Sequence, residues 1–237
     1  MQLFYDPDLR EGACELRAEE ARHAARVLRK QVGDVLDLTD GRGGWFRGKI
    51  TGIDKRTCWL EVTERLRSPR RAPHRLTLLV GPTKQMDRFE YLLEKVTEIG
   101  IDDVRPFFSE HSERNRLRLD RLERVLESAM KQSLRSWMPR LHEPVSLGEA
   151  FEAAGGTDRF LAYLGSEATP LLRDLPLTGR EVVVAIGPEG GFSPREAALA
   201  RTAGYQWASL GPHRLRTETA AIVAVHTLES ARWTASK

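Results

Sequence analysis

The 237-residue chain has few cysteines and no long apolar segment. Its two cysteines, Cys14 and Cys58, lack the spacing of metal ligands and are too few for a disulfide framework. The purely apolar stretches fall far short of the roughly 18 residues that a membrane span requires. No segment at the start has the basic, apolar and small-residue pattern of a secretion signal. These absences predict a cytoplasmic protein with no metal site and no membrane partner.

A modest basic excess lies at the N-terminal end of an otherwise ordinary composition. Hydrophobic residues make up 41% and charged residues 30% of the chain, as in a soluble protein with a sizeable core. The length allows one large domain or two smaller ones. The net charge is +3, and residues 1–72 account for it with fifteen basic against twelve acidic residues. This pattern permits nucleic-acid binding, but solvated surface charge explains it equally well.

Residues 1–72 have the pattern of short strands around one helix. A one-sided apolar pattern predicts a helix over 19–29. Predicted strands and a turn follow at 35–39, 40–44 (the turn), 45–53 and 57–64. We therefore expect a compact β-barrel domain over 1–70. A linker is expected at 67–73, which contains two prolines and three arginines.

From residue 74 onward, buried strands alternate with helices. Apolar runs predict strands at 76–80, 104–108, 159–164, 181–186 and 207–210. Amphipathic patterns predict helices at 87–99, 117–134, 147–154, 194–203 and 218–232. Such alternation indicates an α/β domain over 74–237 with a largely parallel sheet covered by helices on both faces.

Two glycine–proline loops near the end of the chain follow predicted strands, and both bring backbone to the surface. The first is Gly187–Ser193 and the second is Leu210–Ala220. No Lys-Ser/Thr pair follows the first loop as in a P-loop, and the spacing is not that of a dinucleotide fingerprint. A pocket between such loops would be walled by peptide N–H and C=O groups. Those walls suit a neutral or zwitterionic nucleoside cofactor.

Local signals predict how each loop meets the helix that follows it. Ser193 and Glu196 form a capping box with proline at the first helical position. The pair Gly190–Gly191 can adopt positive φ and let a ligand approach the backbone closely. Thr217 is predicted to be the N-cap of the last helix. Glu189 would repel a phosphate, which again favours an uncharged or zwitterionic ligand.

The residues of the two loops resemble those of the bacterial family that methylates N3 of a uridine in small-subunit (16S) ribosomal RNA. That family belongs to the SPOUT class of knotted methyltransferases. Further segments agree and keep their order along nearly the whole chain: His23–Arg29 with Gly33-Asp34, Glu94–Gly100 and Gln132–Arg135. Leu134 departs from the family pattern, in which a small residue is common.

This resemblance implies a PUA-like β-barrel that docks RNA, followed by an α/β domain with a C-terminal trefoil knot. It also implies a homodimer and an S-adenosyl-L-methionine cofactor held mainly by backbone from three loops. Carried over residue by residue, the cofactor-binding positions are Leu164, Gly165, Ile186, Gly187, Glu189, Gly190, Gly191, Leu210, Gly211, Leu215 and Thr217.

Methylation at uracil N3 requires that the ring lose its imino proton. An enzyme can supply a base for this proton, or cations that stabilise the uracil anion. Arg216, beside the expected cofactor, and Arg135, in the third agreeing segment, are the candidates for the cationic role. Glu218 is the carboxylate best placed in the sequence to accept the proton, with helix capping as an alternative role, and Glu189 is less suited.

RNA docking is expected from basic residues of the first domain: Arg10, Arg22, His23, Arg26 and Arg29. Helical spacing would place Arg22, Arg26 and Arg29 on one face. Such phosphate contacts position an RNA without reading its sequence. The expected partner is 16S ribosomal RNA or the small ribosomal subunit.

Two alternatives stay open. A ribose 2′-O-methyltransferase of the same fold class would carry an asparagine-containing motif at the start of the last helix, where this chain has Arg216–Thr219. A non-catalytic RNA-binding assembly factor would have no need of the intact glycines in both loops. Whether the purified protein binds S-adenosylmethionine would distinguish a methyltransferase from a non-catalytic assembly factor.

Overall fold

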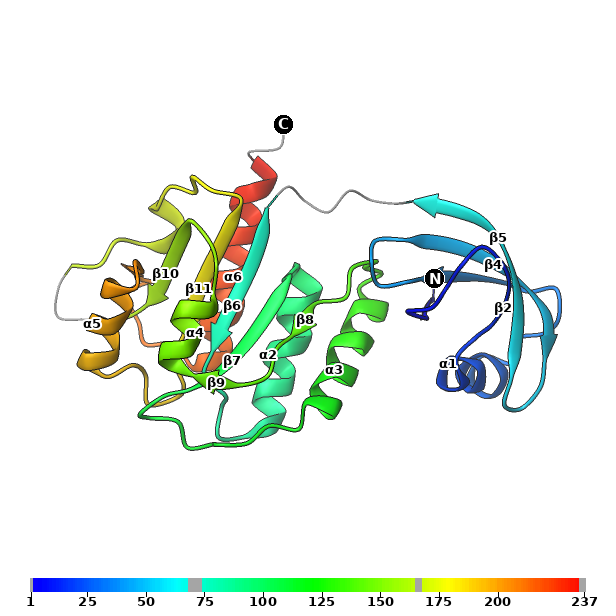
Figure 1. Ribbon diagram of the computed structural model, residues 1–237, viewed down its shortest axis with the longest axis horizontal. Coiled ribbons are helices and arrows are strands. Elements are labelled where there is room, and N and C mark those ends of the chain that lie inside the picture. The colour runs from blue at the N-terminus through cyan, green and yellow to red at the C-terminus, as the bar shows by residue number, and fades with distance from the viewer. Residues whose placement is uncertain (1, 68–73, 165–167, 235–237) are drawn as a thin grey trace. The chain divides into compact units, whose positions relative to one another are not determined.

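The computed structural model describes residues 2–67, 74–164 and 168–234, which form two compact units (Figure 1). Unit 1 comprises Met1–Arg71 and Glu127–Met138, and unit 2 comprises Ala72–Leu126 and Pro139–Lys237. Most of the expected linker lies outside the described residues, so the domain boundary at 70–74 stays a prediction. No pattern in the sequence predicted that the 127–138 segment would join unit 1.

The sheet of unit 1 has five strands in the order β1-β3-β4-β5-β2. They are β1 (Leu3–Tyr5), β2 (Gly12–Glu15), β3 (Val35–Thr39), β4 (Trp45–Ile53) and β5 (Cys58–Arg67). β1 runs parallel to β3, and the other pairs are antiparallel. Alternate residues of the strands, such as Leu36, Leu38 and Leu60, point into one apolar core. The predicted strands over 35–53 therefore have the expected bounds.

The helix of unit 1 differs from the prediction. The α-helix α1 covers only Ala18–Arg22, and a π-helix continues over His23–Val27. The backbone N–H of Leu28 donates to the carbonyl of His23, five residues back, and Arg29 has a φ of 52°. The expected α-helix over 19–29 is therefore wrong in its second half. Because the wider π-turn changes the register, the shared helical face of Arg22, Arg26 and Arg29 is not formed as predicted.

The segment Glu127–Met138 completes unit 1. It contains the end of helix α3 (Leu119–Gln132) and the residues that follow. The N–H of Gly43 donates to the carbonyl of Ser136 at 2.7 Å, and the N–H of Met138 donates to the carbonyl of Gly41 at 2.9 Å. These hydrogen bonds attach the segment to the turn between β3 and β4.

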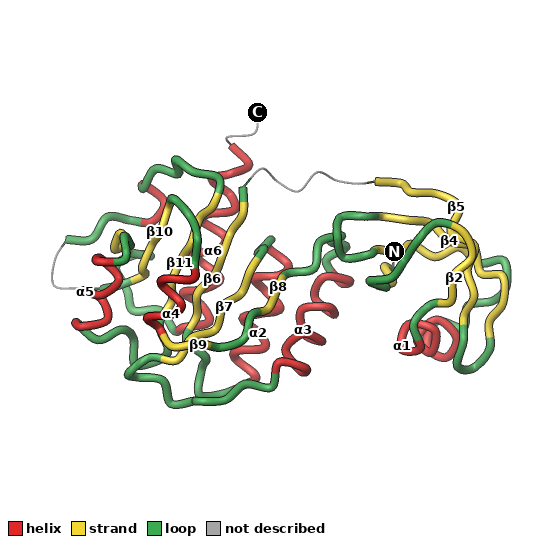
Figure 2. The backbone as a smooth tube through the Cα atoms, viewed as in Figure 1, coloured by secondary structure: helices red, strands yellow, loops and turns green. Residues whose placement is uncertain are grey.

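The sheet of unit 2 is parallel throughout and has the order β12-β10-β11-β6-β7-β8, with β9 also paired to β7 (Figure 2). Its strands are β6 (Arg75–Val80), β7 (Asp103–Phe108), β8 (Arg140–Leu141), β9 (Val145–Ser146), β10 (Asp158–Ala162), β11 (Glu181–Ile186) and β12 (Gln206–Ala208). The central strands β6 and β11 are buried on both faces, which is why they read as continuous apolar runs. The expectation of a parallel α/β sheet is confirmed.

Helices cover both faces of this sheet. They are α2 (Met86–Ile99), α4 (Leu147–Ala153), α5 (Pro194–Thr202) and α6 (Thr217–Thr234), with a 3₁₀ turn at Leu172–Asp174. α2 and α6 pack against each other on one face, while α4 and α5 contribute Phe151, Ala197 and Ala200 to the core on the other. Among the described residues, no helix is long and apolar enough to cross a membrane.

Candidate cofactor and active site

A cavity of about 660 Å³ opens at the carboxyl ends of three neighbouring strands of unit 2. Because β10, β11 and β12 run parallel, the loops that leave them meet at the same edge of the sheet. Open α/β sheets bind ligands in this place, outside the carboxyl ends of their strands. The volume lies in the range of sites for cofactors and other small molecules.

The first loop, after β11, brings three glycines to the cavity. Gly191 has a φ of 71°, in the left-handed region that disfavours other residues. A Cβ at Gly190 would lie 2.6 Å from that of His111, and a Cβ at Gly187 would lie 3.1 Å from the backbone of Gly191. The expected positive φ is confirmed for Gly191, whereas Gly190 is required for space. The loop can pack this closely only with glycine at these positions.

Side chains of other segments hold the first loop. The carboxylate of Glu189 accepts the N–H of Lys84 at 2.9 and 3.1 Å, and its carbonyl accepts from Arg214 at 3.2 Å. After the loop, Ser193 and Glu196 form the predicted capping box at the start of α5. The charge of Glu189 is therefore engaged by a neighbouring loop, although the residue lines the cavity.

The second loop, after β12, faces the first. Gly211 has a φ of 135°, and its N–H donates to the hydroxyl of Ser209 at 3.2 Å. Thr217 is the first residue of α6, and its hydroxyl donates to the carbonyl of Gly187 at 3.1 Å. The first intrahelical bond runs from Ala220 to the carbonyl of Arg216, so the N-cap position falls on Arg216. The expected N-cap at Thr217 is therefore wrong, because this hydroxyl joins the two loops instead.

The cavity combines peptide walls with a cationic rim. Arginines 88, 214 and 216 and His213 line it, together with backbone of both loops. A nucleoside bearing a positive sulfonium and an amino-acid end would find N–H and C=O groups for its polar atoms, and arginines for its carboxylate. The residues present therefore fit S-adenosylmethionine.

Glu218 lies next to the cavity but does not line it. Its Oε1 is 3.9 Å from Nη1 of Arg88, and its side chain is only 12% exposed. Its Oε2 is buried and has no hydrogen-bond partner among the described residues. A carboxylate oxygen left in this state is costly unless another group, such as a substrate, completes its hydrogen bonding.

The structure brings together the cofactor-binding residues expected from the sequence. Those that line the cavity are Leu164, Ile186, Gly187, Glu189, Gly190, Gly191, Leu210, Gly211, Leu215 and Thr217. Gly165 lies outside the described residues. Arg216, expected to be catalytic, lines the same cavity, whereas Arg135 belongs to unit 1.

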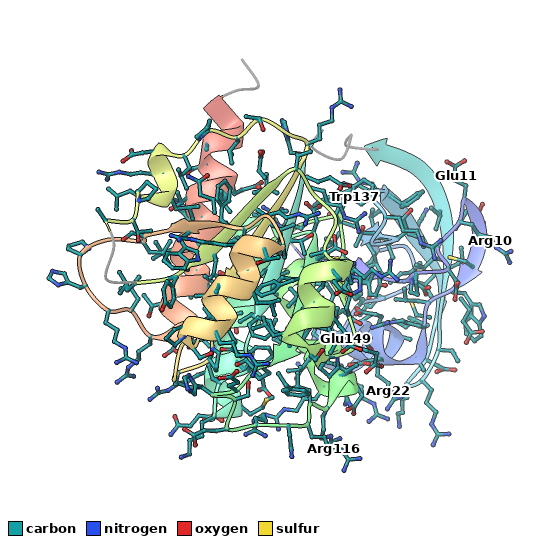
Figure 3. The ribbon with its side chains drawn as sticks, turned by 60° about the vertical axis from the view of Figure 1, so that its left-hand side comes forward. Arg10, Glu11, Arg22, Arg116, Trp137 and Glu149 are labelled. Atoms are coloured by element: carbon teal, nitrogen blue, oxygen red, sulfur yellow. The ribbon has the colours of Figure 1, made fainter. Side chains whose placement is uncertain are left out.

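The residues expected to contact RNA all lie in unit 1. Arg10, Arg22, Arg26 and Arg29 are exposed, and Figure 3 shows the side chain of Arg10 extending outward. His23 is half-buried against the edge of Phe4. The surface of unit 1 therefore offers exposed cations between β1 and β2, on α1 and the π-helix, and just after the π-helix.

Sequence reasoning missed several contributors to the cavity, among them Arg88 and Tyr163. Arg88 stands in the first turn of α2, about a hundred residues before the glycine loops, and reaches the site because α2 packs against α6. Tyr163 follows β10 directly, and its ring lies 4.7 Å from that of Trp207. The end of the predicted strand at 159–164 gave a signal for Tyr163, but nothing local pointed to Arg88.

Comparisons with known proteins agree with this geometry. Residues 70–229 match the family model of an RNA methyltransferase domain, and residues 16–63 match that of an RNA methyltransferase PUA domain. The chain is 30% identical to ribosomal RNA small subunit methyltransferase E of Synechocystis over 91% of this chain and 72% of that protein.

Solved structures extend the likeness to the whole chain. A probable rRNA-methyltransferase from Porphyromonas gingivalis shares 40% identity and a TM-score of 0.90, over 99% of this chain and all of that one. Ribosomal RNA small subunit methyltransferase E from Neisseria gonorrhoeae, solved bound to S-adenosyl methionine, shares 27% identity and a TM-score of 0.88, over 98% of both chains.

Proposed function

The chain belongs to the ribosomal RNA small subunit methyltransferase E family of RNA methyltransferases, and from this premise we propose that it methylates N3 of one uridine in 16S ribosomal RNA. S-adenosyl-L-methionine is the methyl donor. The observation that carries the proposal is the cavity at the ends of β10, β11 and β12, whose glycine-rich peptide walls suit this cofactor.

The cofactor would be held by the two glycine loops together with the residues that follow β10. When bound, S-adenosylmethionine supplies an electrophilic methyl group on a positive sulfur. The chain's own task is to exclude water, to orient the uracil ring in line with that methyl group, and to favour loss of the N3 proton.

Arg216 is the residue proposed to stabilise the negative charge that develops on the uracil carbonyl oxygens. Its position in the lining of the cavity supports this role. Arg135 is proposed to add a second cation. Arg88, which the sequence did not suggest, lines the same cavity and stands 3.9 Å from Glu218, so it offers a further positive group beside the reacting ring.

Glu218 is proposed to accept the N3 proton, directly or through water. Its unpaired Oε2 supports this assignment, because a carboxylate oxygen without a donor has capacity for one. The alternative role, a favourable charge at the N-terminus of α6, needs no proton transfer. Glu218→Gln separates the two roles. If Glu218 is the base, the variant should lose methyl transfer. If it only provides a charge at the helix end, the variant should lose a few tenths to about 1 kcal/mol of unfolding free energy and keep methyl transfer.

RNA docking is proposed for unit 1, through Arg10, Arg22, His23, Arg26 and Arg29. We further propose that the chain works in the cytoplasm as a homodimer and that its C-terminal part forms a trefoil knot. The PUA match to residues 16–63 supports the RNA-docking role.

The test is methyl transfer by the purified protein. Isolated small ribosomal subunits and naked 16S RNA from cells lacking the gene are incubated with labelled S-adenosylmethionine, and the RNA is mapped by mass spectrometry. We expect one N3-methyluridine, and its loss with Arg216→Ala. A 2′-O-methylated ribose, or no labelled RNA with either substrate, would refute the proposal.

A further inference from the structure

A second, smaller cavity lies in unit 1 and takes no part in the site described above. It measures about 260 Å³, and most of its lining residues are polar or charged. The lining residues come from Gln2 and β1, from α1 and the π-helix, and from the end of α3: Gln2, Leu3, Glu20, His23, Ser128, Lys131 and Gln132. A polar cavity of this size on a domain expected to bind RNA requires an explanation beyond packing.

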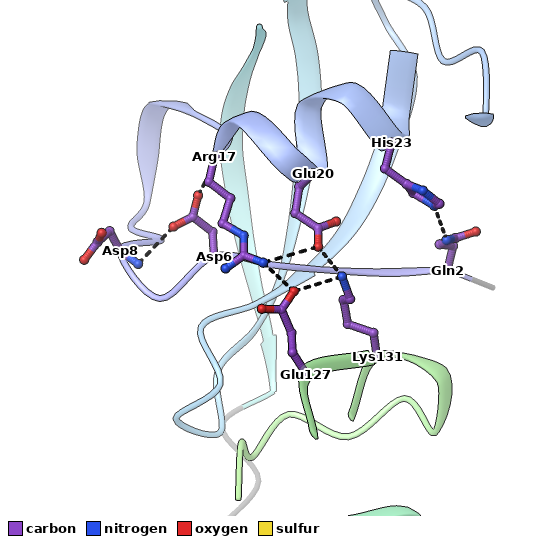
Figure 4. Close-up of polar contacts among 8 residues, drawn as sticks. All are labelled: Gln2, Asp6, Asp8, Arg17, Glu20, His23, Glu127 and Lys131. Carbon is purple, nitrogen blue, oxygen red and sulfur yellow. Dashed lines mark hydrogen bonds and ion pairs between the residues drawn. The ribbon is translucent and has the colours of Figure 1, made fainter. Parts of the chain in front are cut away.

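A buried carboxylate lines this cavity. The side chain of Glu20 is only 2% exposed, and its Oε1 accepts from Lys131. No described residue bonds its other oxygen, Oε2, which Figure 4 shows directed away from Lys131. Burial raises the pKa of Glu20, and this effect outweighs the opposing influence of Lys131 and Arg17. One oxygen of a buried carboxylate is therefore left to meet whatever occupies the cavity.

Donor and acceptor groups surround this oxygen. The ammonium of Lys131 lies between Glu20 and Glu127, with a 3.0 Å contact to the latter. The amide nitrogen of Gln2 donates to Nε2 of His23 at 2.6 Å (Figure 4), and both residues line the cavity. The amide of Gln132 stands at the exposed mouth. The lining thus offers a carboxylate and an ammonium side by side.

We infer that this cavity binds a single unpaired nucleobase of the RNA substrate. The inference rests on the proposed function only in taking RNA as the ligand. Every base presents a hydrogen-bond donor next to an acceptor on its Watson–Crick edge, and Glu20 with Lys131 complements such a pair. A base paired in a duplex has no free edge of this kind.

The charges of the lining favour a base over a phosphate. A phosphate in the cavity would be repelled by the buried carboxylate of Glu20, whereas a neutral base would not be repelled. The exposed arginines of the same unit, Arg22 and Arg26, remain available for the backbone of the same strand. Phosphates would thus position the RNA, and the cavity would require one base to be unstacked.

The test compares two single-stranded ligands of equal charge. Binding of octauridylate and of an eight-residue abasic ribose-phosphate oligomer to the full chain is measured by fluorescence anisotropy. In Gln132→Ala we expect octauridylate to bind about two- to tenfold more weakly, the value of one hydrogen bond, with no change for the abasic oligomer. Ser128→Trp, which places an indole at the mouth, should remove the advantage of the base-containing ligand entirely.

Gln206→Ala, at an exposed position of β12, is the matched control and should bind both ligands as the unmodified chain does. The inference is overturned if the preference for octauridylate over the abasic oligomer survives in both cavity variants. The readout needs neither cofactor nor methyl transfer. A failure of the proposed reaction with an intact base preference would therefore refute the function and leave the cavity assignment standing.

Discussion

The two units offer a ligand different kinds of surface. In unit 2 glycines at 187, 190, 191 and 211 bring backbone to the wall of the cavity. In unit 1 the exposed arginines and the small cavity present side chains that carry charge. Changes in unit 2 should therefore act through backbone conformation, and changes in unit 1 through charge and salt. Four experiments probe the two units.

The largest effect is expected from Gly191→Val in the first loop. The φ of 71° is strained for a β-branched residue at a cost of about 1–3 kcal/mol. The added methyl groups would also project into open space at the cavity wall. Calorimetric titration should show S-adenosylmethionine binding below detection, with RNA binding retained.

Gly148→Val is the matched control. Gly148 lies in α4, has open space around it and has no positive φ. Thermal unfolding of Gly191→Val should remain cooperative, which shows that the chain still folds. Undiminished cofactor binding in Gly191→Val would remove the first loop from the site.

The next largest effect concerns unit 1. Arg26→Ala combined with Arg29→Ala should weaken RNA binding and lower the slope of log affinity against log salt by about 1–2, one counterion for each lost phosphate contact. Cofactor affinity should not change. An equal loss of cofactor and RNA affinity would contradict the assignment of RNA binding to unit 1 and cofactor binding to unit 2.

Lowering the pH should change the folding stability in opposite directions through one buried carboxylate in each unit. In unit 2, burial raises the pKa of Asp103, but hydrogen bonds from Arg75 and His142 outweigh burial and leave it below its ordinary value of 3.8. The stability that Asp103 provides is present above that value and is lost as pH falls. Burial also lowers the pKa of His142 from 6.5, so the unfolded chain takes up this proton first and stability declines below about pH 6.5.

In unit 1, the raised pKa of Glu20 has the opposite consequence, because the folded chain takes up the proton first and gains stability as pH falls. Asp103→Asn should destabilise by about 1–3 kcal/mol at neutral pH, and its deficit should shrink as the pH falls below about 3.8. Any deficit of Glu20→Gln should instead grow in a higher pH range, as the pH falls toward 4.5. Urea unfolding at several pH values measures both, and parallel trends would contradict the assignment.

The smallest effect is expected at the end of α3. Leu134 has a φ of 54°, and the N–H of Arg135 donates to the carbonyl of Met130, the geometry of a helix end that favours glycine. Leu134→Gly should raise the unfolding free energy by up to about 1 kcal/mol. Leu134→Ala keeps the strain and loses the side chain, so it should be no more stable than the parent. Equal unfolding free energies for Leu134→Gly and Leu134→Ala would show that backbone strain at residue 134 does not affect stability.

Much of unit 2 could be predicted because its signals are local. Continuous apolar runs marked β6 and β11, and the capping box at Ser193 marked the start of α5. Glycines after buried strands marked the loops, and parallel strands place such loops at one edge. The cofactor-binding residues followed from these features and from the family resemblance.

The remaining features depend on contacts between distant segments. The helical pattern over 19–29 did not disclose the π-helix, which sets the positions of Arg26 and Arg29. Arg88 reaches the cavity only through the packing of α2 on α6. The residues 127–138 join unit 1 through hydrogen bonds to a turn some ninety residues earlier. Periodicity within one window carries no information about such contacts.

A site built from main-chain amides and carbonyls has a consequence for inhibition. A compound that recognises only those groups would contact atoms that every amino acid possesses, so point mutation could not delete its partners. Escape would have to move the loops themselves, and the glycines that permit their shape leave few substitutions that also keep the natural donor bound. Ligands aimed at the peptide walls should therefore meet less acquired resistance than ligands aimed at the arginine rim.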